Sequence, residues 1–101
     1  MIVVRFQIRS QPQHAEGIRA ALAEVVAPSR AVEGVVSFDV AEDLTDPNAF
    51  IACEVFEDQA ARDRQESLPE VGRVLALLPQ SLAAPPEVTV YDAAAVESPG
   101  G

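Results

Sequence analysis

Three segments between Val32 and Tyr91 decide the fold: VEGVVSFDV at 32–40, DLTDPNAFIACEVFEDQAARDRQ at 43–65 and LPEVGRVLALLPQSLAAPPEVTVY at 68–91. The pair Glu33-Gly34 is a turn signal, and the apolar run at 35–40 predicts a strand. Residues 43–48 are rich in turn formers, and residues 50–56 predict a second strand. Two strands joined by a loop of this length indicate an antiparallel hairpin.

Helical signals follow the hairpin. Asp58 is a suitable N-cap for a helix, and Pro69 is placed to begin a second helical segment, because proline is tolerated in a first turn. The apolar stripe of that segment consists of Val71, Val74, Leu75 and Leu78. Pro85-Pro86 ends the helical pattern, and residues 87–91 predict a last strand.

The amino-terminal part of the chain contributes one strand and one helix. Residues 2–9 alternate between apolar and polar side chains, a period typical of a strand with one buried face. From His14 the apolar residues recur every three or four positions, which predicts an amphipathic helix. Pro28 is expected to weaken the end of this helix.

The predicted order is β-α-β-β-α-β, an α+β ferredoxin-like fold in which helices cover one face of a four-stranded antiparallel sheet. The other face is predicted to carry Arg5, Gln7, Ser37, Asp39, Thr89 and Tyr91, mixed with Phe50 and Val3. A sheet face without helices must stay wet or pack against another subunit, so we expect a homodimer. Residues 1–93 form a single domain, and 94–101 form a flexible tail.

The composition excludes several classes of protein. The net charge is −9 and all seven basic residues are Arg, which disfavours binding to nucleic acid or to anionic membranes. No segment approaches the roughly 20 apolar residues of a membrane-spanning helix, and the amino terminus lacks the order of a signal peptide. We therefore expect a cytoplasmic protein.

Few residues suit a metal or a cofactor. Cys53 is the single cysteine and is expected to be buried in its strand; His14 is the single histidine and is expected to lie in solvent. Glu42, Asp43 and Asp46 form an acidic loop that lacks the spacing of a calcium site. We predict no metal, and no tightly held flavin or nicotinamide, since a glycine-rich phosphate loop is missing.

Glu54 is the polar residue that departs most from its surroundings, because it lies in the most apolar strand. A carboxylate there can have a raised pKa and act as a base, or it can pair with Arg5 or Arg30 and fix the sheet register. Arg73 is a second candidate, either directed into a cavity under the helices or solvated on the helix surface.

Several short motifs carry a resemblance to a known family. The run Glu54-Val55-Phe56-Glu57-Asp58, the Asp46-Pro47 turn, Gly34 before its strand and the ending PPEVTVY resemble the antibiotic biosynthesis monooxygenase family. The resemblance implies a homodimer, a dimeric α+β barrel with a pocket between sheet and helices in each subunit. It also implies oxygenation of phenols, quinols or anthrone-type molecules with dioxygen and without a metal or bound flavin.

The chain departs from the pattern of the family that it resembles in the helical region after the acidic turn. Many relatives have one histidine in the helix after the acidic turn and another before a Phe; here these positions hold Gln65 and Glu70, with Val71 in place of the Phe. Relatives that degrade haem use an Asn, a Trp and a His. This chain has no Trp, and Leu75 stands at that His position, so haem degradation is disfavoured.

Two hypotheses about function remain open. The first is a cofactor-independent monooxygenase of a small aromatic molecule, with Glu54, Gln65 and Arg73 as catalytic residues and a pocket lined by Phe6, Phe38, Phe56 and Leu78. The second is a non-catalytic dimer that binds a small apolar ligand or supports a pathway. An aromatic-sized cavity containing Glu54 favours the enzyme, whereas a solid core with Glu54 tied to an arginine favours the binder.

Overall fold

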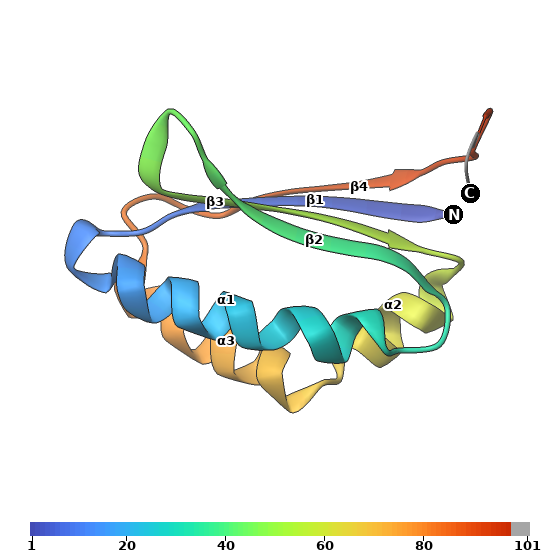
Figure 1. Ribbon diagram of the computed structural model, residues 1–101, viewed down its shortest axis with the longest axis horizontal. Helices are drawn as coiled ribbons and strands as arrows, with labels where there is room; N and C mark the ends of the chain where they lie inside the picture. The colour runs from blue at the N-terminus through green and yellow to red at the C-terminus, as the bar shows by residue number, and fades with distance from the viewer. Residues whose placement is uncertain (98–101) are drawn as a thin grey trace.

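The computed structural model describes residues 1–97. Its elements, in chain order, are β1 (Ile2–Arg9), the short helical turn η1 (Pro12–His14), α1 (Ala15–Arg30), β2 (Val35–Asp43), β3 (Asp46–Phe56), α2 (Gln59–Glu66), α3 (Pro69–Ser81) and β4 (Glu87–Asp92). The four strands form one antiparallel sheet in the order β2-β3-β1-β4, and the helices lie on one side of it (Figure 1). The predicted ferredoxin-like α+β fold is confirmed. The predicted tail at 94–101 lies partly outside the described residues.

The predicted starts of α2 and α3 are confirmed, and the end of α1 differs from the prediction. The Asp58 carboxylate accepts a hydrogen bond of 2.8 Å from the Ala61 backbone N–H, and α3 begins at Pro69. Helix α1, however, continues past Pro28 to Arg30. Pro28 lacks the N–H that would donate to the carbonyl four residues earlier, and its ring crowds that carbonyl. The last turn still closes, because the Ala31 N–H donates to the Pro28 carbonyl at 3.2 Å.

The hairpin between β2 and β3 is tighter than the sequence predicts. Asp43 pairs directly with Asp46, so only Leu44 and Thr45 form the connection. The Asp43 carboxylate accepts hydrogen bonds from the Thr45 N–H and hydroxyl, at 2.8 and 2.7 Å. This capped turn lets both strands extend further, and Pro47 becomes a residue of β3 rather than of the loop.

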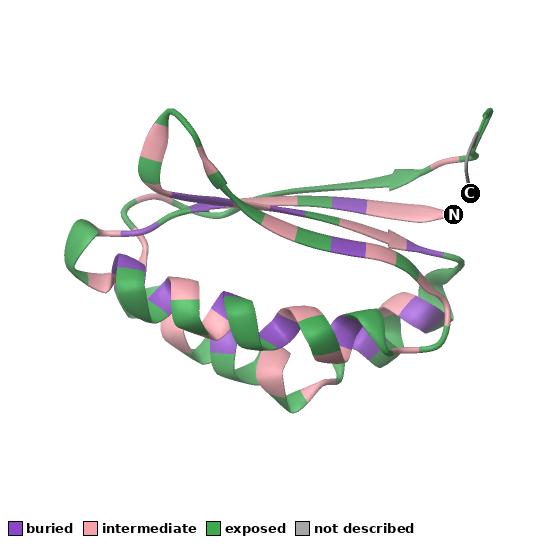
Figure 2. Cartoon of the chain, in the orientation of Figure 1, coloured by how far each residue is buried: buried purple, intermediate pink, exposed green. Residues whose placement is uncertain are grey.

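The core lies between the helices and the inner face of the sheet. Its buried members include Ile8, Ile18, Leu22, Val25, Phe38, Phe50, Val74 and Leu78. Buried residues recur along α1 at intervals of three or four, whereas β4 is exposed along its whole length (Figure 2). The sheet edge at β4 is therefore not covered by the helices.

Two predictions about strand faces are wrong. Phe50, predicted on the open face, is 2% exposed in the core, and Cys53, predicted to be buried, is exposed. Side chains alternate along a strand, so Phe50, Glu54 and Phe56 share the inner face while Cys53 shares the open face. On that open face Cys53 lies between Arg5 on β1 and Asp39 on β2.

Helix α2 packs closely against the start of β2. Gly34 has a φ of +87°, and a Cβ at this position would lie 2.6 Å from the Cβ of Ala61 on α2. Such a contact is shorter than van der Waals packing allows, so only glycine fits both the backbone conformation and the space. The Arg64 guanidinium also donates to the Glu33 carbonyl at 2.7 Å, and these contacts fix where α2 lies.

No helix within residues 1–97 is both long enough and apolar enough to span a lipid bilayer.

Candidate functional site

A cleft of about 420 Å³ opens between the inner face of the sheet and the helices. Its apolar lining comes from six elements: Val4 and Phe6 on β1, Leu22 and Val25 on α1, Phe38 and Val40 on β2, Ala52 on β3, Val71, Val74 and Leu75 on α3, and Val88 on β4. Its polar lining consists of Glu54, Arg62, Gln65 and Glu66. A mostly apolar cavity with a few converging polar groups is typical of a small-molecule site.

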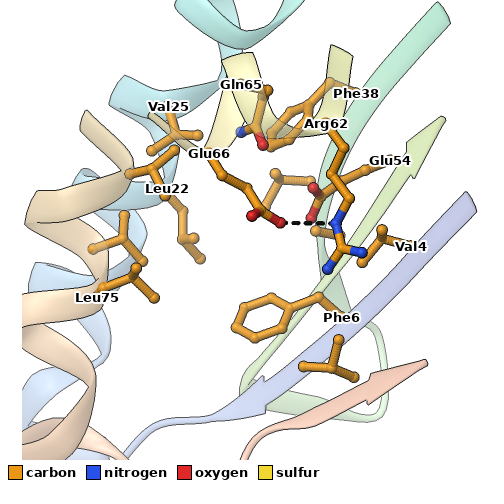
Figure 3. A pocket seen from close by; sticks show the side chains of 15 residues that line it. Val4, Phe6, Leu22, Val25, Phe38, Glu54, Arg62, Gln65, Glu66 and Leu75 are labelled. Carbon is orange, nitrogen blue, oxygen red and sulfur yellow. Dashed lines mark hydrogen bonds and ion pairs between the residues drawn. The ribbon is translucent and has the colours of Figure 1, made fainter. Parts of the chain in front are cut away.

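Glu54 enters the cleft from the middle of the sheet. It lies on β3 between Val4 of β1 and Phe38 of β2, with its carboxylate directed toward Arg62 and Glu66 of α2 (Figure 3). The pKa of Glu54 is raised from 4.5 to about 7, first by burial and then by the negative charge of Glu66, while Arg62 acts in the opposite direction. This carboxyl group can therefore exchange a proton near neutral pH.

The predicted pairing of Glu54 with Arg5 or Arg30 is wrong. Arg5 lies on the open face of the sheet, where its guanidinium donates to the Gln7 side chain at 3.1 Å. Arg30 donates to the Phe38 carbonyl at 2.9 Å and to the Asp39 carboxylate at 3.0 Å. Within residues 1–97, Glu54 has no ion pair of its own, because the alternation of β3 directs it away from both arginines.

Helix α2 supplies the other three polar groups. Arg62 and Glu66 are one turn apart and form an ion pair of 2.8 Å at the cleft (Figure 3). Arg62 is largely buried, with 23% of its side chain exposed. Gln65, only 3% exposed, lies between them in sequence and donates from its Nε2 to the Ser29 Oγ of α1 at 3.0 Å.

The structure brings four of the predicted site residues to the cleft: Glu54, Gln65, Phe6 and Phe38. The other three do not line it. Arg73 is exposed on α3 and faces Glu70 at 3.9 Å, while Phe56 and Leu78 are 0% and 7% exposed inside the core. Arg73 points outward because it falls off the Val71–Val74–Leu78 stripe that turns α3 toward the core.

Sequence reasoning missed Arg62 and Glu66, which line the cleft. Their spacing carried a usable signal. Residues three and four apart share a helix face, so a cleft position for Gln65 implies that Arg62 lies nearby, and Glu66 lies four residues from Arg62.

The acidic residues of the hairpin are engaged with other groups. Glu42 forms an ion pair with Arg19, and Asp46 pairs with Arg9 at 3.0 Å. Within the part of the chain that the structure describes, no group of three or more His, Cys, Asp or Glu side chains is arranged to hold a metal ion.

Comparisons with known proteins agree with this architecture. The chain is 31% identical over 97 residues to the uncharacterized protein sll1783 of Synechocystis, covering 96% of this chain and 66% of that protein, so it spans slightly less than two thirds of its relative. The crystal structure of PA3566 from Pseudomonas aeruginosa superposes with a TM-score of 0.83 at 26% identity, covering 93% and 94% of the two chains. Rv0793 from Mycobacterium tuberculosis gives a TM-score of 0.86 at 24% identity, covering 96% and 98%.

The sequence model of one family, described as antibiotic biosynthesis monooxygenase, matches residues 1–76. The matched region runs from β1 into α3 and includes all four polar residues of the cleft. The resemblance predicted from the sequence is thereby confirmed, and the chain belongs to the antibiotic biosynthesis monooxygenase family.

Proposed function

We propose that this protein is a cofactor-independent monooxygenase of a small aromatic molecule that bears a phenolic or enolic hydroxyl, such as an anthrone or a quinol. The observation that carries the proposal is Glu54, a partly buried carboxyl group with a pKa of about 7 in the wall of an apolar cleft of about 420 Å³. Membership of the family and the size of the cleft support the same class of substrate.

Glu54 acts as the general base in this proposal. The O–H bond of the substrate breaks, its proton goes to the Glu54 carboxylate, and the electron pair remains on an electron-rich aromatic anion. Arg62 lies beside Glu54 and stabilises the negative charge that develops. The anion then reduces dioxygen; for an anthrone-type substrate one oxygen atom becomes a ring carbonyl and the other leaves as water, with all electrons supplied by the substrate. The apolar walls exclude water from the anion.

Oxygen uptake tests the proposal. We expect the protein to accelerate dioxygen consumption with anthrone or with a naphthoquinol above the rate of spontaneous oxidation, with one dioxygen consumed per molecule of product in the case of anthrone. An oxygen electrode combined with chromatography of the product measures both quantities. Binding of these compounds without accelerated uptake would contradict catalysis and favour a ligand-binding protein. Neither binding nor uptake across the panel would contradict both functions.

We also propose that two copies associate through the open face of the sheet. That face carries the half-buried Val3 and Val55, which pair across β1 and β3, and the exposed Tyr91 of β4 beside them. A sheet with helices on one side only gains stability when a second apolar surface covers the other side.

Sedimentation measures the association directly. We expect a species of about twice the 10.7 kDa chain mass at micromolar concentration. Val55→Glu places a negative charge in the apolar patch that Val55 forms with Val3 and Tyr91 and is expected to shift the protein to the monomer, because the interface would bury a carboxylate without a partner. Ala20, exposed on α1 on the other side of the sheet, offers Ala20→Glu as the control. A protein that remains monomeric in its wild-type form even at high concentration would contradict the dimer.

A further inference from the structure

Ser29 and Gln65 form a buried polar contact that the proposed chemistry does not use. Ser29 is 0% exposed and Gln65 is 3% exposed, and the Gln65 Nε2 donates to the Ser29 Oγ at 3.0 Å. Among residues 1–97 it is the sole hydrogen bond between two buried side chains. The two other buried serines, Ser10 and Ser81, lie together and do not line the cleft.

The contact joins two helices at the wall of the cleft. Ser29 belongs to the last turn of α1, and Gln65 belongs to the last turn of α2. A glutamine side chain that is held at its nitrogen by a fixed hydroxyl can no longer rotate freely about its terminal bond. With the nitrogen held, the carbonyl oxygen of the planar amide is fixed on the side away from Ser29.

That oxygen has no hydrogen-bond donor from the protein within residues 1–97, although Gln65 lines the cleft. In Figure 3 the Gln65 side chain points into the same space as Glu54 and Glu66. Among the described residues, Oε2 of Glu70 is the one side-chain polar atom that is both sealed from solvent and without a partner, so the Gln65 oxygen is reached from the cleft. An acceptor that the protein leaves open in an apolar wall is available to a hydroxyl donor on a bound molecule.

We propose that Ser29 holds the Gln65 amide with its carbonyl oxygen toward the cleft, so that the cleft selects flat apolar molecules bearing a hydroxyl donor over molecules of the same shape without one. Gln65 contacts the ligand directly, and Ser29 is a positioning residue. The inference rests on one part of the proposed function, the binding of an aromatic ligand in the cleft. It adds the atom that recognises the ligand hydroxyl and the residue that orients this atom.

A matched pair of probes tests the selection. 1-Naphthol and 1-methoxynaphthalene differ by one methyl group, and only the naphthol donates a hydrogen bond. The protein has no Trp and one Tyr, so the fluorescence of the probes can be followed without interference. Titrations at a mildly acidic pH, below the pKa of about 7, are preferred because Glu54 is then mainly protonated and no longer competes as a charged acceptor. The Glu66 carboxylate is engaged with Arg62.

We expect the wild-type protein to bind the naphthol about tenfold more tightly than the ether, the usual effect of one buried hydrogen bond. Gln65→Met keeps the length of the side chain and removes the acceptor, so the naphthol and the ether should then bind equally well. Ser29→Ala leaves Gln65 in place but frees its amide, and the ratio of the two dissociation constants should fall severalfold.

Two further variants separate positioning from general stability. In the Gln65→Met background, Ser29→Ala should leave the ratio unchanged, because Ser29 acts only through Gln65. Ser81→Ala removes a buried serine outside the cleft and should leave the wild-type ratio intact. Circular dichroism of each variant confirms that it is folded before titration.

The possible failures are distinguishable. Equal binding of naphthol and ether by the wild-type protein, or preference for the ether, would overturn the selection by Gln65 while leaving the ligand cleft in place. A Ser29→Ala effect of the same size in the Gln65→Met background would overturn the positioning role. Binding of neither probe at millimolar concentration would count against the proposed function itself.

Discussion

Glu54→Gln is expected to reduce substrate-dependent oxygen uptake by about 10²–10⁴-fold, the range found when a general base is removed. The amide has nearly the shape of the carboxyl group, so the cleft should keep its volume and its affinity for the substrate. It cannot accept a proton, and deprotonation of the substrate would then depend on water. The oxygen electrode measures the rate, and fluorescence titration with a substrate analogue measures the affinity.

The pH dependence of the wild-type rate provides a second signature. Only the carboxylate form of Glu54 is a base, so the rate should rise with pH and level off above a pKa of about 7. Glu57→Gln, which changes an exposed glutamate on the same strand-to-helix connection, is the control and should leave both rate and profile unchanged. A Glu54→Gln variant that retains most of the wild-type rate would contradict the assignment of Glu54 as the base.

Glu54→Gln is expected to lower the rate but to raise the free energy of unfolding. The pKa of Glu54 is about 7 in the folded protein and 4.5 when the group is exposed, so the folded state binds the proton more tightly. Protonation of Glu54 therefore favours the folded state; this contribution to the free energy of unfolding is complete below pH 4.5 and is lost as the pH rises through 7. Above that range the buried charge lowers the free energy of unfolding by about 3 kcal/mol at most.

Glu54→Gln should therefore raise the free energy of unfolding by about 1–3 kcal/mol at a pH of about 8 and leave it nearly unchanged at a pH of about 4. Urea denaturation at a fixed protein concentration measures both values. A variant that is less stable than the wild type under the alkaline condition would show that the charged carboxylate is well solvated. A gain in stability with a loss of rate is the pattern expected of a functional residue.

Gly34→Ala is expected to lower the free energy of unfolding by about 2–4 kcal/mol, because two unfavourable effects add. The backbone at Gly34 has a φ of +87°, a conformation that costs energy for any residue with a Cβ. The new methyl group would also lie 2.6 Å from the Cβ of Ala61, which is itself fully buried. Helix α2 must move to relieve this contact.

The chain offers two matched controls for this substitution. Gly17 on α1 and Gly72 on α3 are exposed, and a Cβ added to either would meet no other atom within 4 Å. Gly17→Ala and Gly72→Ala should therefore stabilise their helices by about 0.5–1 kcal/mol each. Urea unfolding curves distinguish the three variants. A Gly34→Ala protein within about 0.5 kcal/mol of the wild type would show that α2 shifts without cost.

Much of the architecture could be predicted from local patterns. The period of two at 2–9 changes to a helical period after His14, and turn formers separate the strands β2 and β3. These signals were sufficient for the order of elements. The Phe50 and Cys53 errors came from treating 50–56 as apolar on both sides. Strict alternation from Phe56 back through Glu54 would have assigned both residues to the correct faces.

The cleft was harder to predict because it depends on contacts between distant elements. Glu54 stood out as a carboxylate in an apolar strand, but its environment is set by α2. The position of α2 follows from Gly34 meeting Ala61, a contact between residues that no periodicity connects. Arg62 and Glu66 could be recognised as cleft residues only once that packing was known.

Helix α2 has a consequence for how this fold diversifies. Three of the four polar residues of the cleft come from eight consecutive residues, Gln59–Glu66, whereas the apolar walls come from six other elements. Exchanging side chains within two turns of one short helix would replace most of the reactive groups and leave the shape of the cavity intact. Evolution can thus alter the reaction and the cavity separately, and a designer who grafts a relative's α2 onto this chain can do the same.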